Sequence, residues 1–171
     1  MINLVNKINR GLIIDLLTKR TWLLPFIYYI HSYQGVTLDE LRELTGVRTQ
    51  VIKRALWWLR KYGVIEQCGE KYIITEDARP IIDEFLLDYC TTGKHHILKT
   101  GSTYFVAIIR RTRITAYTIP AQYIEELKKM EENVQTEFTA EDLANTLGIP
   151  RNLAHRITYL RKILKECSKK A

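Results

Sequence analysis

A capped helix that ends in glycine and precedes a second, basic helix constrains this chain more than any other feature. Thr37 begins the first helix, and Glu40 stands three residues later, which is the spacing of a capping box. Gly46 ends that helix, because glycine readily adopts the left-handed conformation that a tight turn between helices requires. The buried stripe of this helix consists of Leu38, Leu41 and Leu44. The pattern predicts two short helices packed around a glycine turn.

The second helix is expected from about Arg48 to Tyr62, and Gly63 stops it. Its basic residues are not balanced by any acid, whereas the preceding helix carries Asp39, Glu40 and Glu43. The basic residues are Arg48, Lys53, Arg54, Arg60 and Lys61. Residues 64–68 and 71–75 then read as two strands joined by a turn. This segregation of charge is expected when one helix faces phosphates and its neighbour does not.

The order helix, capped helix, glycine turn, basic helix and β-hairpin over Thr21–Thr75 resembles a winged helix-turn-helix. Its most specific stretch, Ala55–Ile65, resembles the hLxxLxxxGLI ending of recognition helices in prokaryotic winged-helix transcription regulators. The resemblance implies that the start of the basic helix enters the major groove of DNA, where arginine and glutamine read bases. The DNA-binding residues expected in this unit are Arg48, Thr49, Gln50, Lys53, Arg54 and, on the returning strand, Lys71. The alternative is a helix whose basic face is merely solvated.

A second copy of the pattern lies 102 residues further along the chain. Thr37 matches Thr139, and Gly46 matches Gly148, with acids again on the first helix and bases on the last. The later buried positions match better one residue out of step, so the repeat is approximate. The DNA-binding residues expected in this unit are Arg151, Asn152, His155 and Arg156. The alternative is a helical hairpin used for dimerisation.

The middle of the chain carries most of the net charge, with five basic residues and no acid between Thr91 and Ile119. Residues 91–101 are expected to form a loop, and 103–109 and 113–119 a hairpin. Its tip holds three further DNA-binding candidates, Arg110, Arg111 and Arg113, which are placed to clamp phosphates or enter a minor groove. Both strand faces are apolar, which indicates burial between domains or in a dimer.

Three further helices are expected, at residues 2–18, 21–33 and 76–90, and a fourth begins at Pro120 and runs to about 132. The chain is therefore expected to be mainly α-helical with small β-hairpins, as a winged helix domain plus a C-terminal tri-helical helix-turn-helix. The expected domains are residues 1–90, 91–119 and 120–171. The helices expected at 2–18 and 76–90 each present an apolar face that one subunit would not fully cover, which predicts a homodimer.

The net charge of +7 and the pI near 9.3 favour an anionic partner, with nucleic acid first. Charged residues interrupt the first twenty positions, which argues against a signal peptide, and the longest apolar run is too short to span a membrane. Cys68, Cys90 and Cys167 are expected to be free thiols in a cytoplasmic protein, with a Cys68–Cys90 disulfide left open. His95 and His96 are expected to be exposed to solvent.

The sequence shows no nucleotide-binding loop, hydrolase elbow, zinc-protease motif or acidic metal cluster, so neither an enzyme nor a cofactor is expected. The predicted function is sequence-specific binding of double-stranded DNA in transcription regulation. One alternative is a replication-initiator or partition-type DNA binder of a plasmid or virus. The other is a winged-helix module for protein–protein interaction, because fold does not determine function.

Overall fold

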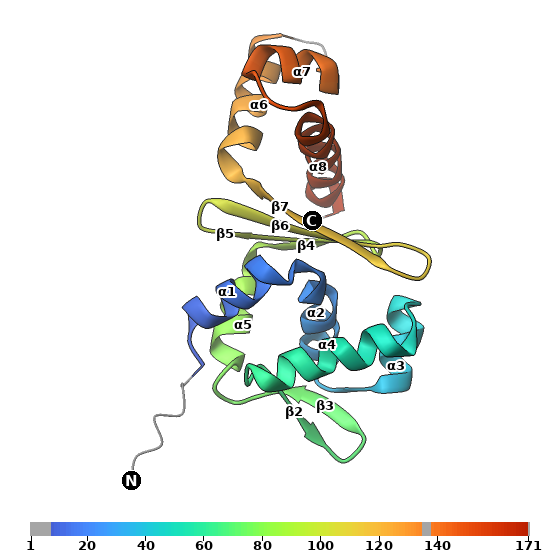
Figure 1. Ribbon diagram of the computed structural model, residues 1–171. Helices are drawn as coiled ribbons and strands as arrows, with labels where there is room; N and C mark the ends of the chain where they lie inside the picture. The colour runs from blue at the N-terminus through green and yellow to red at the C-terminus, as the bar shows by residue number, and fades with distance from the viewer. Residues whose placement is uncertain (1–7, 135–137, 171) are drawn as a thin grey trace.

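The computed structural model describes residues 8–134 and 138–170. Two helical units lie at opposite ends of the molecule, and a four-stranded sheet lies between them (Figure 1). The first unit also contains a three-stranded sheet. The mainly α-helical prediction is therefore wrong, because the described residues combine helices with two antiparallel sheets in a mixed α and β fold.

Within residues 8–85, the first unit contains six helices, one of them a short 3-10 helix, and three short strands. In chain order these are α1 (Arg10–Lys19), η1 (Thr21–Leu23), α2 (Leu24–Ser32), β1 (Val36–Thr37), α3 (Leu38–Thr45), α4 (Thr49–Lys61), β2 (Ile65–Cys68), β3 (Lys71–Ile74) and α5 (Arg79–Phe85). The expected α3, α4 and β2–β3 hairpin are confirmed. The two-residue strand β1 was missed, because it pairs with β3 only through tertiary contact.

The capping chemistry predicted for α3 is present atom by atom. The Glu40 amide donates to Thr37 Oγ1 at 3.1 Å, and the Thr37 amide donates to Glu40 Oε1 at 3.2 Å. Gly46 follows with φ 71°, in the left-handed region that glycine adopts without strain. The turn therefore sets α4 beside α3, with Ile52, Ala55, Leu56 and Leu59 buried.

The central sheet corrects the prediction for residues 76–101. The helix expected to reach residue 90 stops at Phe85, and the expected loop at 91–101 forms a strand. After the turn η2 (Leu86–Asp88) come β4 (Tyr89–Thr91), β5 (His95–Thr100), β6 (Thr103–Ile109) and β7 (Ile114–Pro120), which lie side by side in that order. Polar residues gave β5 the composition of a loop, yet its middle is buried between neighbouring strands and the first unit.

Strand β6 explains why both faces of the predicted hairpin are apolar. Phe105, Ala107 and Ile109 belong to the core of the first unit. The alternate residues Tyr104, Val106 and Ile108 belong to a second core on the opposite face of the sheet. Since successive side chains of a strand point to opposite faces, one strand serves both cores. The expected burial between two units is confirmed.

The second unit stands on this other face and contains α6 (Ala121–Asn133), α7 (Ala140–Leu147) and α8 (Arg151–Lys170). It repeats the local chemistry of the first, since Thr139 and Asp142 form a capping box and Gly148 has φ 66°. A disulfide between Cys90 and Cys167 joins β4 to the far part of α8. The prediction of free thiols is wrong for this pair, and so is the Cys68–Cys90 alternative; Cys68 is free and exposed.

The apolar faces expected to need a second subunit are largely covered within the chain. On α1, Ile13, Leu16 and Leu17 are buried, and on α5, Ile82 and Phe85 are buried. Residues 2–7 of the predicted first helix lie outside the described residues. The reason given for a homodimer is therefore wrong, because the central sheet and α2 supply contacts that the sequence did not reveal. Within the described residues, no helix has the length and apolar character to cross a membrane.

Candidate nucleic-acid interface

The first half of α4 presents its polar residues to solvent. Arg48 occupies the N-cap position in extended conformation, and Gln50, Lys53 and Arg54 are exposed. Among residues 8–134 and 138–167, neither Arg48 nor Lys53 nor Arg54 takes part in an ion pair. The buried stripe on the opposite side of α4 holds the helix in place, so these cations are available to an external partner.

Thr49 and the acids of α3 take different positions from those cations. Thr49 is half-buried, and its Oγ1 accepts a hydrogen bond from Arg42 at 3.4 Å. Arg42 also donates to Asp39 at 3.3 Å, so the acid at the start of α3 is partly neutralised within its own helix. Thr49 therefore helps to hold α4 against α3. The sequence did not predict this role.

The tip of the β6–β7 hairpin reaches the first unit. The Arg110 amide donates to the Arg113 carbonyl at 2.7 Å, which closes the turn and leaves the side chains exposed. Arg113 and Arg54 line one hollow of about 250 Å³, together with Trp22 on η1. Two basic groups that lie 59 residues apart in the sequence thus meet on one surface.

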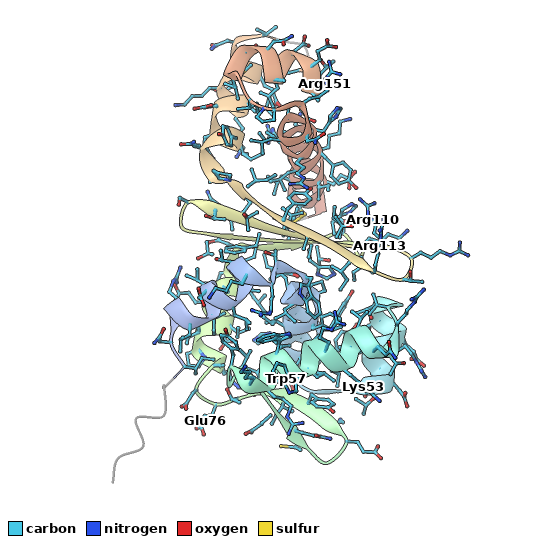
Figure 2. All side chains as sticks on the ribbon, in the orientation of Figure 1. Lys53, Trp57, Glu76, Arg110, Arg113 and Arg151 are labelled. Atoms are coloured by element: carbon cyan, nitrogen blue, oxygen red, sulfur yellow. A yellow bond between two sulfur atoms is a disulfide. The ribbon has the colours of Figure 1, made fainter. Side chains whose placement is uncertain are left out.

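Arg110 and Arg111 extend this surface toward the turn between α3 and α4. They line a cavity of about 750 Å³ with Leu44–Gly46, Lys94 and one acid, Glu43. Figure 2 shows Arg110 and Arg113 close together at the hairpin tip and Lys53 farther down at α4, all in the right-hand half of the view, with Glu76 at the lower left. We call Arg48, Gln50, Lys53, Arg54, Arg110, Arg111 and Arg113 the basic surface.

The candidates on α8 divide into two groups. His155 and Arg156 line a groove of about 390 Å³ with Arg110, so they adjoin the basic surface. The Arg156 guanidinium lies 4.6 Å from the centre of the Tyr117 ring, a cation–π contact. Arg151, by contrast, lies at the far end of the second unit and pairs with Glu141 at 3.6 Å (Figure 2). Asn152 is exposed next to it.

Lys71 is exposed on the β2–β3 hairpin, at the end of the first unit away from the central sheet (Figure 1). None of the cavities that join α4, the β6–β7 tip and α8 includes it. Lys71 therefore shares no cavity with the other predicted residues. A partner bound to those residues would have to contact Lys71 through a separate part of its own surface.

The expectation for the two adjacent histidines is wrong. His96 is fully buried among Tyr28, Tyr29 and Tyr89, and its Nδ1 lies 2.6 Å from the Tyr89 hydroxyl. Burial lowers the pKa of His96 to about 4, and it raises the pKa of Tyr89 well above its usual value. Only the assembled sheet shows this, because adjacent residues of a strand face opposite sides.

Lys94, Tyr117 and Tyr159 were missed as neighbours of the predicted site. Lys94 was part of the acid-free segment and could have been included on that signal. The two tyrosines had no signal, because strand β7 and helix α8 meet only in the folded chain. Among the described residues, no three His, Cys, Asp or Glu side chains gather as metal ligands would.

Comparison with protein-family models, with curated proteins and with solved structures found no match for this chain.

Proposed function

We propose that this chain binds double-stranded DNA in a sequence-specific manner and regulates transcription, with the basic surface as its contact face. The start of α4 enters the major groove in this proposal, where Arg48, Gln50 and Arg54 read base edges. Arg111 and Arg113 contact the phosphates beside the groove and set the register of the protein. The resemblance of Thr21–Thr75 to winged helix-turn-helix regulators supports this arrangement.

The observation that carries the proposal is the convergence of Arg54 and Arg113 on one hollow. Within residues 8–134 and 138–167, neither Arg54 nor its sequence neighbour Lys53 forms an ion pair. A cation that already pairs with a carboxylate gains little free energy by binding a phosphate, because one anionic partner only replaces another. Cations that lack an acidic partner release counterions from DNA when they bind, which is the main source of affinity for a duplex. Their placement on two elements gives the contact face an extent that one helix alone does not supply.

The first test measures the dependence of duplex affinity on salt by fluorescence anisotropy, with a duplex selected from a random pool. If about six phosphates are neutralised, the affinity should fall roughly a thousandfold between 50 and 200 mM salt. Lys53→Ala should reduce the slope of log affinity against log salt by about one. Lys129→Ala, which removes an exposed lysine from α6, is the matched control and should leave the slope unchanged.

A salt-independent affinity, or identical slopes for the wild type and Lys53→Ala, would contradict the proposal and favour a module for protein–protein interaction. The selected sequence then separates two roles for a DNA-binding protein. A site in promoters supports transcription regulation, whereas a site at an origin supports replication initiation or partition.

A further inference from the structure

A groove between α8 and strand β7 has the size of a small-molecule site. Its volume is about 390 Å³, and its walls are formed by Arg110, Thr115 and Tyr117 from the sheet and by His155, Arg156 and Tyr159 from α8. Sites for small ligands in proteins occupy about 300–1,000 Å³. The groove is therefore large enough for one ligand and is bounded by two different elements.

The charge of the groove is positive. Arg110 and Arg156 line it, and within the described part of the chain no carboxylate does. The contact with the Tyr117 ring holds Arg156 in place without using its N–H donors in an ion pair. Arginine presents its donors in a planar fork that matches a phosphate. The two arginines thus give the groove a positive charge that an anionic ligand would neutralise.

The groove also contains a fixed aromatic ring. Tyr159 is 37% exposed, and its hydroxyl lies 2.6 Å from His95 Nε2. His95 is held in turn by Thr92, with Nδ1 2.7 Å from its hydroxyl oxygen. Burial is the main cause that lowers the pKa of His95, and the charges of Arg110 and Lys94 lower it further against the opposing effect of Glu166. The contacts through His95 thus orient the Tyr159 ring.

We infer that this groove binds a nucleoside phosphate, with the phosphate on Arg110 and Arg156 and the base against the Tyr159 ring. Stacking of a base on an aromatic side chain and bonding of a phosphate to arginine are separate interactions, and side chains suited to both line this one groove. The same chemistry is present in a free mononucleotide and in an unpaired nucleotide of a DNA strand. The inference does not require that the chain bind duplex DNA.

Occupancy of the groove would affect the basic surface directly. Ile108, Arg110 and Tyr159 line both this groove and the larger cavity beside the turn between α3 and α4. A phosphate on Arg110 therefore neutralises a cation that the duplex would otherwise contact. The groove is in a position to weaken duplex binding when it holds a free nucleotide.

The experiment is calorimetric titration of the full chain with deoxyadenosine monophosphate, adenosine and inorganic phosphate. We expect the monophosphate to bind at least tenfold more tightly than either part alone. Arg156→Gln should abolish that advantage over adenosine, while Arg151→Gln, an exposed arginine of the same helix outside the groove, should bind as the wild type does. Tyr159→Leu should weaken the binding of both adenine compounds and leave that of phosphate unchanged.

Tyr159→Phe keeps the ring and removes only the hydroxyl, so it retains most of the affinity if stacking is the main interaction, even should Tyr159→Leu fail to fold. A single-stranded oligonucleotide of eight deoxyadenosines distinguishes the two sources. Binding of the free monophosphate assigns the groove to a small effector, and binding of the strand alone assigns it to an unpaired nucleotide.

The inference is overturned if neither the monophosphate nor the strand binds, or if Arg156→Gln binds both as the wild type does. Its failure is distinct from that of the proposed duplex binding, because the duplex test measures the salt slope and its change in Lys53→Ala. Lys53 does not line the groove.

Discussion

The two capped helix pairs, α3–α4 and α7–α8, share their local structure and differ in what surrounds it. Both first helices span eight residues, begin with a threonine capping box and end at a glycine in the left-handed region. Both second helices are rich in basic residues. Local sequence thus produces the same turn twice, 102 residues apart.

The difference lies in what the basic residues of the second helices contact. On α8, Arg161 and Lys165 pair with Glu131 of α6 at 3.2 and 3.5 Å, in a half-buried cluster. Arg151 pairs with Glu141, and Arg156 lies on Tyr117. The cations at the start of α4 have no such acid in the described chain. A basic helix in the sequence therefore predicts a binding surface only where the fold leaves its charges without internal partners.

The largest expected effect tests whether the two units unfold together. Leu41 and Leu143 occupy equivalent positions in the two cores, and both are fully buried. Leu41→Ala and Leu143→Ala should each lower the free energy of unfolding by about 2–5 kcal/mol. Because β6 contributes to both cores, both variants should shift one calorimetric transition. Leu87→Ala, at an 82% exposed position, is the control. Two transitions, each shifted by only one variant, would show that the units are independent.

The disulfide distinguishes the second unit from the first, because it links Cys167 of α8 to Cys90 of the central sheet. It closes a loop of 77 residues, and Cys167→Ser should lower the free energy of unfolding by about 2–4 kcal/mol, measured in urea. Cys68→Ser removes the exposed free thiol and should have no such effect. A midpoint in urea that a reducing agent leaves unchanged would contradict this prediction.

The buried His96 should make the stability of the fold depend on pH. Above about pH 6.5 His96 is neutral in both the folded and the unfolded chain, so it contributes no pH dependence there. Below that pH the unfolded chain takes up a proton, whereas the folded chain resists until about pH 4. The free energy of unfolding should therefore fall between pH 6.5 and 4, by up to about 3 kcal/mol.

Urea unfolding at several pH values checks this expectation. His96→Gln should reduce the pH dependence in that window. Equal slopes for the wild type and His96→Gln would show that the imidazole is not held neutral by burial.

The last comparison concerns duplex affinity rather than stability, and it uses charge reversal at the two helix pairs. Arg54→Glu places an acid at the proposed duplex contact, and the loss should exceed the roughly 1–3 kcal/mol of one base contact, or more than about tenfold in affinity. Arg151→Glu removes a cation that already pairs with Glu141, so duplex affinity should change by less than about threefold. Anisotropy with the selected duplex measures both. Equal losses would show that the second pair also contacts DNA.

Sequence analysis located α3, α4, the β2–β3 hairpin, α7 and the start of α8 because each follows from residues close in the chain. It missed β4 because residues 76–90 were expected to form one helix, and it missed β5 because Thr, Gly, His and Lys make residues 91–101 resemble a loop. Strand β5 is stable because β6 pairs with it and because Tyr28 and Tyr29 of α2 pack against His96. The sequence also indicated the candidate residues of α4 and of the hairpin tip. It did not indicate that Arg54 and Arg113 line the same hollow.

The sequence alone determined the two capped helix–glycine–helix units and the location of the basic segments, because caps, turns and periodic stripes act over three or four residues. Only the tertiary structure decided which cations pair with an internal acid, as Arg161 does with Glu131, and which, like Arg54, have no such partner among the described residues. It also decided the pairing of Cys90 with Cys167 and the burial of His96. These depend on contacts between residues far apart in the chain, which local patterns do not encode.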